Sequence, residues 1–341
     1  MDPLKTIRAV PWPKSLRAEA GLETWTLETP FIIARGREYA IEVAVVTLHA
    51  DGVTGRGESC PVFHYGETPA SVIAQIRGMV AYLARGAHWA DLHDTFPPGA
   101  ARNAVDCAVW DLVSKLSGQR VNALLDLPPS EPVETVFTLS VAAPEAMAEA
   151  AMRAASHARL KLKLSGDGAD TKRVRAVREA VPDMPLIVDV NEYWTRELLI
   201  EAMPALAECG VEMLEQPLKA GADDELKGVD RLVPIGADES CHVTADLAGL
   251  QSLYDVVNIK LDKTGGLTEA LRLRAVAKEL GLQTMVGCML GTSLAMAPAH
   301  LIAQECQFVD IDAPLLIGRD RKDGLGYSGG QVAPPSQALW G

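Results

Sequence analysis

Charged side chains recur at regular spacing in the second half of the chain, on stretches that otherwise resemble buried strands. They are separated by 22 to 26 residues, and the set is Lys163, Asp189, Glu215, Asp238 and Lys260. Each interval matches about one strand plus one helix, so the charges should occupy equivalent heights on successive strands. Three carboxylates in a desolvated site repel one another unless a cation lies between them. Because the three offer only oxygen atoms, we expect Mg²⁺, with Mn²⁺ as a substitute, rather than zinc.

Eight short apolar stretches carry these charges and must position them. They cover residues 136–142, 159–164, 186–191, 212–217, 233–238, 255–261, 283–289 and 308–313. Stretches typical of helices alternate with them, which favours a closed parallel barrel. An open doubly wound sheet is the alternative, but no glycine-rich phosphate loop follows the first strand. The charges lie towards the C-terminal ends of the strands, where barrel enzymes place catalytic groups. For any single acid, an ordinary salt bridge at a strand end is the alternative.

The first 130 residues have a different pattern, with two strand candidates at 25–33 and 39–48 and two amphipathic helices at 69–86 and 100–118. We therefore expect an α/β fold in which a modified TIM-type (β/α)7β barrel carries an α+β capping domain. The expected bounds are 1–125 for the cap, 126–315 for the barrel and 316–341 for a C-terminal segment that returns to the cap.

Composition narrows the class of protein. The formal net charge of −13 argues against a nucleic-acid partner, which needs clustered Lys and Arg. No apolar run has the length of a membrane span, and residues 1–15 lack the apolar core of a signal peptide, so we expect a cytoplasmic protein without membrane association. The six cysteines form no CxxC pair, which predicts neither a structural zinc site nor a disulfide framework. Sequence alone does not decide between a monomer and a homo-oligomer.

Six ordered motifs resemble the enolase superfamily. They are KLK at 161–163, DVNEYW at 189–194, EQPL at 215–218, ADES at 237–240, NIKLDKTGG at 258–266 and GCMLGTS at 287–293. Within that superfamily the chain is most similar to the muconate lactonising subgroup, and there to the dipeptide epimerases of the L-Ala-D/L-Glu epimerase type. The resemblance covers nearly the whole chain. It implies that Asp189, Glu215 and Asp238 bind Mg²⁺ and that Lys163 and Lys260 are acid/base catalysts on opposite faces of the substrate.

The chemistry of such an enzyme explains why these residue types are needed. A proton next to a carboxylate is barely acidic, so its removal requires a base and a cation that stabilises the resulting enediolate. Each lysine should have a lowered pKa to act as a base, and nearby cations lower it. With a lysine on each face, the expected outcome is inversion at one carbon by 1,1-proton transfer. Cys288 and Met289 stand on the seventh strand where the mandelate-racemase-like branch would have a histidine.

Three further charged residues lie beside the expected ligands. Lys161, on the same face as Lys163, is either a cation that lowers the pKa of Lys163 or a counter-charge to a carboxylate. Glu192 and Glu239 have the opposite strand parity to the ligands, so we expect them to point away from the barrel axis.

Asp310 and Asp312 form an Asp-x-Asp pair at the end of the eighth strand. Residues i and i+2 of a strand face the same way, and two close carboxylates tolerate each other best with a cation between them. In the dipeptide epimerases that the chain resembles, such a pair binds the free α-ammonium of the substrate. The alternative is that one acid bonds to backbone and the other pairs with an arginine such as Arg319.

Loops of the cap should complete the substrate pocket. The hairpin around PFIIARGREYAIE offers Arg35 and Arg37 for an acidic substrate side chain, and we favour Arg35. Tyr65, with His64 beside it, should close the pocket, although simple loop packing is the alternative. Cys288 and Met289 complete the list of residues expected at the substrate.

The predicted function is therefore Mg²⁺-dependent epimerisation of a small dipeptide at the α-carbon of its C-terminal residue, with L-Ala-D/L-Glu in cell-wall peptide metabolism as the expected substrate. An N-acyl amino acid racemase, for example of N-acetylglutamate, is the nearest alternative, followed by a cycloisomerase or o-succinylbenzoate synthase. A non-catalytic barrel that only binds ligands is the least favoured, because the lysines and all three acids are present.

Overall fold

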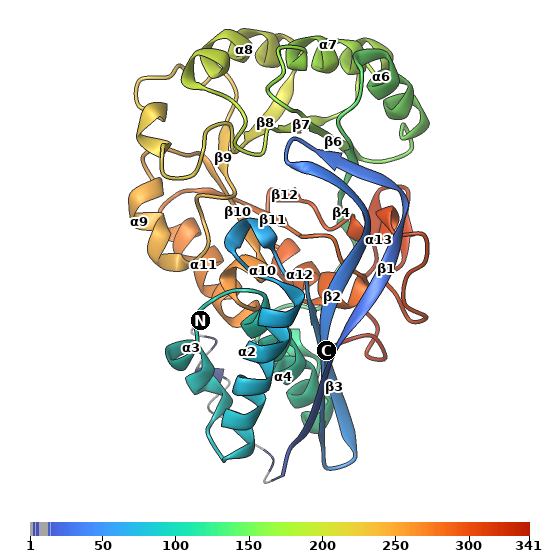
Figure 1. Ribbon diagram of the computed structural model, residues 1–341, viewed down its shortest axis with the longest axis vertical. Helices are drawn as coiled ribbons and strands as arrows, with labels where there is room; N and C mark the ends of the chain where they lie inside the picture. The colour runs from blue at the N-terminus through green and yellow to red at the C-terminus, as the bar shows by residue number, and fades with distance from the viewer. Residues whose placement is uncertain (1–2, 4, 7–12, 14) are drawn as a thin grey trace.

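Eight parallel strands form the centre of the computed structural model, which describes residues 3, 5–6, 13 and 15–341 (Figure 1). In spatial order they are β5 (Val136–Leu139), β6 (Arg159–Lys163), β7 (Leu186–Asp189), β8 (Val211–Glu215), β9 (Ile235–Ala237), β10 (Val256–Lys260), β11 (Gln283–Gly287) and β12 (Phe308–Val309). All pair in parallel, in the order of the sequence. The predicted eight-stranded barrel with its separate cap is confirmed.

The strand period of two fixes what fills the barrel and what lines its mouth. One buried apolar cluster takes a residue from each of six strands: Val136, Ile187, Met213, Val256, Met285 and Phe308. Asp189, Glu215 and Asn258 lie two residues further along three of these strands, on the same face. Asp310 lies two residues after Phe308, just past the end of β12. Because successive side chains alternate between faces, the apolar layer forms a floor and the polar groups stand directly above it.

The hydroxyl of Thr135 joins the first and last strands of the sheet. Thr135 Oγ1 donates to the carbonyl of Val309 at 3.4 Å and accepts the backbone N–H of Ile311 at 3.0 Å. One threonine side chain thus bridges the two ends of the strand array, next to the pair Asp310 and Asp312.

Helices cover the outside of the barrel, although less regularly than strict alternation requires. The long ones are α6 (Pro144–Arg153), α7 (Asp170–Ala180), α8 (Arg196–Glu208), α11 (Leu267–Glu279) and α12 (Ser293–Ala303). Shorter turns are η3 (Asp223–Leu226), η4 (Thr244–Asp246), α9 (Leu247–Leu250), α10 (Leu261–Thr264) and α13 (Ala313–Leu316). The expectation of a full helix after every strand is wrong after β8 and β9. After β8, the positive φ angles of Gly221 and Gly228 interrupt helical backbone.

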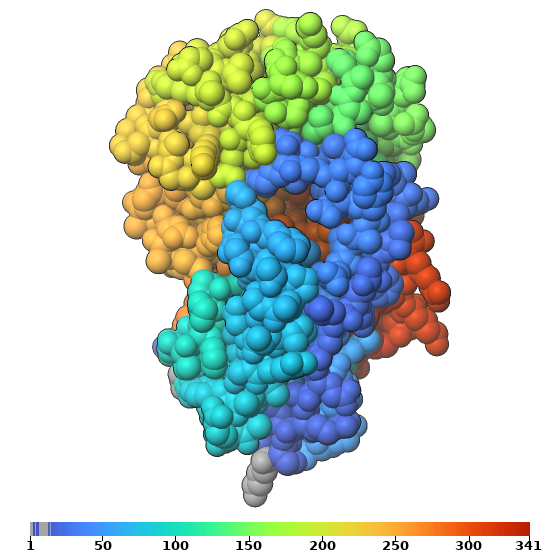
Figure 2. Space-filling model, viewed as in Figure 1, coloured from blue at the N-terminus to red at the C-terminus, as the bar shows by residue number. Residues whose placement is uncertain are grey.

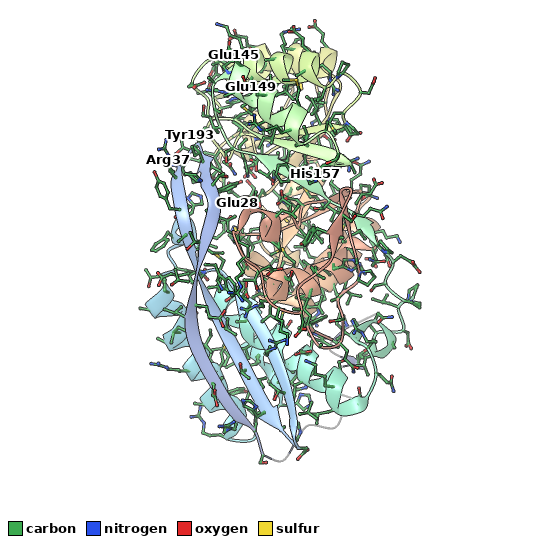
Figure 3. All side chains as sticks on the ribbon, turned by 90° about the vertical axis from the view of Figure 1, so that its right-hand side faces the viewer. Glu28, Arg37, Glu145, Glu149, His157 and Tyr193 are labelled. Carbon is green, nitrogen blue, oxygen red and sulfur yellow. The ribbon has the colours of Figure 1, made fainter. Side chains whose placement is uncertain are left out.

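The cap consists of a three-stranded antiparallel sheet packed on helices. Its elements are β1 (Arg17–Ile33), β2 (Gly36–Ala50), β3 (Val53–Ser59), η1 (Phe63–Tyr65), α2 (Pro69–Ala84), η2 (Trp89–Asp91), α3 (Leu92–Thr95), α4 (Ala100–Ser117) and α5 (Val121–Leu124). Gly57 lets α4 approach β3 closely, since a Cβ there would lie 2.1 Å from the carbonyl oxygen of Ala104. The long β1–β2 hairpin extends from this sheet across the barrel (Figures 1 and 3).

The C-terminal segment contacts the cap at two points. Arg321 pairs with the buried Glu58 of β3 at 2.6 Å, and Trp340 Nε1 donates to the carbonyl of Cys107 in α4 at 2.9 Å. Between them, β13 (Tyr327–Ser328) and β14 (Gln331–Val332) form a small sheet with β4 (Val133–Glu134). The domain bounds given above stay predictions.

Among the described helices, none combines the length and apolar character needed to cross a lipid bilayer. Most of the N-terminal segment at 1–15, in which we expect no signal peptide, lies outside the described residues.

Candidate active site

Three carboxylates meet above the apolar floor of the barrel. In the sheet register Lys163 lies opposite Asp189, and Asp189 lies opposite Glu215, which places these charges at one height. Asp238 follows β9 directly. One oxygen atom from each of Asp189, Glu215 and Asp238 lies within 4.8 Å of the other two, and all three residues are buried. The three acids cluster as the sequence predicted, but the expectation of one height for all five charges is wrong. Glu215 lies opposite Gly236, and Gly236 opposite Val256, so Asp238 and Lys260 lie further towards the C-terminal strand ends.

Lysines surround these carboxylates. Lys163 Nζ donates to Asp189 at 2.5 Å, and Lys260 Nζ donates to Asp238 at 2.7 Å. Lys161 lies deeper, with its Nζ 3.2 Å from Asp189, 2.7 Å from Glu215 and 2.7 Å from Asp310. These contacts make Lys161 a counter-charge to three carboxylates, which is one of the two roles considered for it above.

The pKa shifts reflect this crowding. Burial raises the pKa of Glu215, and the charge of Asp189 adds to it, so that it reaches about 7. Burial acts in the same direction on Asp189, but Lys163 and Lys161 outweigh it and lower the pKa of that carboxyl. Burial lowers the pKa of Lys260, yet the nearby carboxylates, Asp238 above all, raise it overall. This direction belongs to a site in which Asp238, at 2.7 Å, is the partner of Lys260, and a lowered lysine pKa in the metal-loaded protein stays a prediction.

The carboxylate cluster fits a divalent cation. Its donor set is all oxygen, as Mg²⁺ and Mn²⁺ prefer. The three carboxylates are buried together, and buried like charges are costly unless cations lie beside them. The Lys161 ammonium, 2.7 Å from Glu215 Oε2, supplies one such cation.

Asp310 and Asp312 come together at the same mouth. The expected strand at 308–313 is wrong beyond Val309, where β12 ends, so strand alternation does not set the direction of these two acids. Their oxygens nevertheless approach within 4.8 Å of each other and of Cys288 Sγ. Asp312 accepts the backbone N–H of Thr138 at 2.6 Å, which matches the alternative in which one acid bonds to backbone. Asp310 pairs with Lys161 and not with Arg319, the arginine named in that alternative. Burial raises the pKa of Asp312 to about 7, and the charge of Asp310 adds to this shift.

A cavity of about 630 Å³ lies between the barrel mouth and the cap. Figure 2 shows the hollow between the blue hairpin and the light-blue cap loop. Its lining includes every residue that the sequence placed at the substrate or in catalysis: Arg35, Tyr65, Lys161, Lys163, Lys260, Cys288, Met289, Asp310 and Asp312. Asp238 of the carboxylate cluster also lines it. Asp189 and Glu215 have no exposed surface and lie beneath it. The ring of Tyr65 packs edge-on against His242, with centroids 4.5 Å apart.

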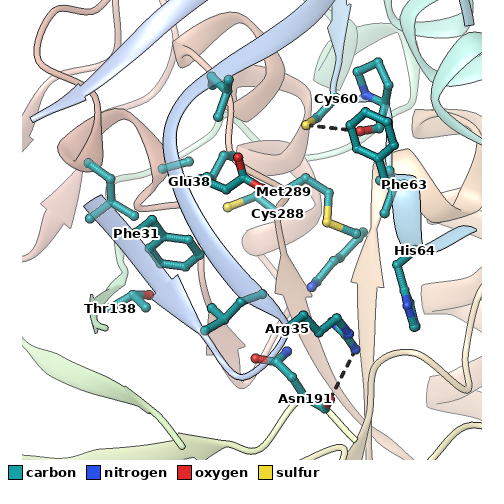
Figure 4. Close-up of a pocket in the computed structure, with 18 of the residues that line it drawn as sticks. Phe31, Arg35, Glu38, Cys60, Phe63, His64, Thr138, Asn191, Cys288 and Met289 are labelled. Carbon is teal, nitrogen blue, oxygen red and sulfur yellow. Dashed lines mark hydrogen bonds between the residues drawn. The ribbon is translucent and has the colours of Figure 1, made fainter. Parts of the chain in front are cut away.

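The hairpin contributes Arg35 to this cavity (Figure 4), whereas the exposed Arg37 lies at its outer end (Figure 3). Arg35 Nη2 donates to Glu192 at 2.8 Å, to the carbonyl of Asn191 at 3.3 Å, and to Glu239. The expectation that Glu239 points away from the barrel axis is wrong, because β9 ends at Ala237 and strand parity no longer applies two residues later. Glu192 likewise follows the end of β7 and turns to the cap.

Sequence reasoning missed several residues of the site. Asn258 donates to Glu215 at 2.6 Å, and its parity with Lys260 on β10 could have revealed it. Lys263 donates to Asp238 Oδ1 at 2.6 Å and to the Asp238 carbonyl. It stands in α10, beyond the strand, where no periodic signal points to the site.

Family models match both parts of the chain. Residues 18–126 match "Mandelate racemase / muconate lactonizing enzyme, N-terminal domain", and residues 145–337 match "Enolase C-terminal domain-like".

Relatives of known activity cover nearly the same span. L-Ala-D/L-Glu epimerase of Escherichia coli (strain K12) is 43% identical over 91% of this chain and 97% of its own length. N-acetyl-D-glutamate racemase of a Pseudoalteromonas species is 43% identical over 87% of this chain and 94% of its own. A crystal structure of an enolase family member from Agrobacterium tumefaciens, with bound sodium and L-Ala-L-Glu, is 44% identical, has a TM-score of 0.93, and aligns over 96% of this chain and all of that one.

These matches confirm the expected superfamily and place the chain with isomerases. The chain belongs to the mandelate racemase/muconate lactonizing enzyme family of the enolase superfamily, among its epimerases and racemases.

Proposed function

We propose that this protein epimerises a dipeptide at the α-carbon of its C-terminal residue, with L-Ala-D/L-Glu as the substrate pair. The observation that carries the proposal is the shared cavity: it is lined by Lys163, Lys260 and the acidic pair Asp310 and Asp312, and the carboxylate cluster reaches it through Asp238. The relatives described as an L-Ala-D/L-Glu epimerase and as a structure with bound L-Ala-L-Glu support the choice of substrate.

The two lysines act from opposite sides. Lys163 stands on β6 and Lys260 on β10, four places apart in the order of eight strands, so they face each other across the barrel. A substrate α-carbon held between them offers its proton to one lysine, while the other delivers a proton to the opposite face. Removal and return on opposite faces invert the configuration. General acid–base catalysis of this kind typically contributes 10²- to 10⁴-fold to the rate.

Asp189, Glu215 and Asp238 would hold the cation, for which we propose Mg²⁺. A divalent cation there supplies positive charge beside the substrate carboxylate and so lowers the free energy of the enediolate. The lysine contacts orient the three ligands: Lys161, Lys163 and Lys263 each hold at least one of these carboxylates.

The acidic pair selects the amino end of the substrate. Asp310 and Asp312 are both less than a tenth exposed and share a single lysine partner, Lys161, through Asp310. An α-ammonium placed between them would offset the surplus negative charge. At the other end of the substrate, Arg35 is the proposed partner of a glutamyl side chain, with Tyr65, Cys288 and Met289 around the peptide.

The second candidate is racemisation of N-acetylglutamate, which the Pseudoalteromonas relative favours at the same 43% identity. An N-acetyl group has no positive charge, so it leaves the charge of the acidic pair uncompensated. This is the reason to rank the dipeptide first.

A stereochemical screen in D₂O tests the proposal. Mg²⁺-loaded protein should replace the α-proton of the C-terminal residue of both L-Ala-L-Glu and L-Ala-D-Glu with deuterium and interconvert them, as followed by NMR. Faster exchange of N-acetylglutamate than of either dipeptide would favour the second candidate. No exchange in any of these compounds would refute an epimerase of this substrate class.

A further inference from the structure

Glu192 has a largely buried side chain whose carboxylate contacts two lining residues of the cavity, Arg35 and His64. Its backbone has a φ of +75°, following Asn191 at +48°, a conformation that non-glycine residues seldom adopt. Its Oε1 accepts the backbone N–H of Ala220 in the next barrel loop at 2.8 Å. Since its side chain is only 8% exposed, Glu192 is fixed from the barrel side before any substrate arrives.

The other oxygen of Glu192 contacts the β1–β2 hairpin and the loop that follows β3. Oε2 lies 2.8 Å from Arg35 Nη2 of the β1–β2 hairpin and 2.8 Å from His64 Nε2 of the second cap loop. A carboxylate oxygen between a guanidinium and an imidazole is the arrangement that an acidic ligand would itself seek. Glu192 therefore already engages the two cap groups that an acidic substrate side chain could use.

Arg35, a cation that lines the cavity, already has acidic partners in the described part of the chain. Arg35 carries one positive charge and pairs with two carboxylates, those of Glu192 and Glu239. Burial lowers the pKa of Arg35, but these carboxylates, Glu239 first, raise it above its ordinary value, so the guanidinium stays charged. An acidic substrate side chain must therefore share Arg35 with both acids or displace one of them.

We propose that Glu192 is a specificity-determining residue that competes with the substrate's side-chain carboxylate for Arg35 and His64. The proposal rests on the dipeptide epimerase function proposed above. Glu192 limits how strongly the pocket prefers an acidic over a neutral C-terminal side chain. It thereby keeps neutral dipeptides within the substrate range.

Glu192→Gln tests this inference, because glutamine keeps the acceptor for Ala220 N–H and the side-chain shape while it removes the charge. The readout is kcat/KM for α-deuterium exchange of L-Ala-L-Glu, divided by that of its neutral isostere L-Ala-L-Gln. We expect this ratio to rise about fivefold, since a partly exposed ion pair contributes up to roughly that factor. Glu192→Ala, which removes the charge without adding an amide, should shift the ratio in the same direction.

Glu38→Gln is the matched control. Glu38 also lines the cavity, but it forms no ion pair with any residue in the described ranges, Arg35 included. Its substitution measures the general effect of removing one negative charge, and we expect a ratio shift of less than about half that of Glu192→Gln.

Two results would overturn the inference. A ratio that stays constant or falls in both Glu192 variants would mean that Glu192 only positions Arg35 or latches the cap. An equal rise in Glu38→Gln would mean that net charge, not competition for Arg35, sets the preference. Failure of the proposed function looks different, because the wild-type protein itself would then exchange neither dipeptide.

Discussion

Replacing either lysine proposed for catalysis should separate proton exchange from epimerisation. Lys163 and Lys260 approach from strands β6 and β10, on opposite sides of the mouth. In Lys163→Ala only Lys260 can remove an α-proton, and it can return one only to the face from which it took it. Epimerisation should stop in both variants. Each variant should still exchange the α-proton of one epimer, and the two variants should choose opposite epimers.

The magnitude follows from the role of each group. Loss of a positioned general base costs about 10²- to 10⁴-fold in rate, or roughly 3 to 5 kcal/mol of barrier. The substitution also frees a buried carboxylate, since Lys163 Nζ lies 2.5 Å from Asp189 and Lys260 Nζ lies 2.7 Å from Asp238. Removing one partner of such a pair can cost about 3 to 5 kcal/mol of stability, so folding must be checked by thermal unfolding with Mg²⁺ present.

The assay incubates each pure epimer of Ala-Glu in D₂O and follows α-proton loss by NMR and configuration by polarimetry. Lys115→Ala is the control, because Lys115 pairs with the buried Asp111 at 2.8 Å in the cap helix α4, away from the cavity lining. It should retain two-way turnover. The two-base assignment would be refuted by a single lysine variant with full two-way turnover, or by two variants that exchange the same epimer.

Three further predictions test the carboxylate cluster, the acidic pair and Asp262, a buried acid that accepts hydrogen bonds from Cys60 and Asn103 of the cap. Treatment with a chelator should abolish α-proton exchange and Mg²⁺ should restore it, whereas undiminished turnover by metal-free protein would rule out the carboxylate cluster as a metal site. Asp312→Asn should lower kcat/KM for L-Ala-L-Glu at least about tenfold more than for N-acetylglutamate, because a charged ammonium contact is worth about 1.5 to 3 kcal/mol; equal losses would remove the ammonium role. Burial raises the pKa of Asp262 to about 7, so the folded protein keeps a proton that the unfolded chain loses near pH 4. Stability should therefore fall as pH rises from about 4 to 7, and Asp262→Asn should flatten that slope in urea unfolding; an unchanged slope would contradict the assignment.

Site residues on the strands were predictable from two regularities: the repeat of one strand plus one helix, and the alternation of side chains along a strand. The repeat of one strand plus one helix placed Asp189 and Glu215 at one height, and their register in the sheet confirms it. The period of two along a strand put Lys161 and Lys163 on one face. Neither argument needs knowledge of the tertiary structure, which is why Lys163 and Lys260 could be proposed from the sequence.

Residues beyond the strand ends could not be predicted in the same way. Glu239 enters the cavity two residues after β9, where backbone direction depends on the loop rather than on alternation. Lys263 reaches Asp238 from the short helix α10, and Glu192 reaches Arg35 from a left-handed turn. Contacts between the hairpin and these loops join residues more than 150 positions apart, and no local sequence pattern encodes such a pairing.

Residues on the barrel strands and residues on the cap loops differ in how freely they can be replaced. Groups proposed for chemistry stand on strands whose register is locked by the apolar floor, so moving one of them shifts the packing beneath it. Groups proposed for side-chain selection, Arg35 and His64, stand on cap loops and meet the barrel through the carboxylate of Glu192. Substitutions in these loops can alter binding of one dipeptide relative to another while the lysines and the metal carboxylates stay in place. Cap variants should therefore change mainly the KM ratios between dipeptides, whereas variants of the two lysines and of the carboxylate cluster should change kcat for all of them alike.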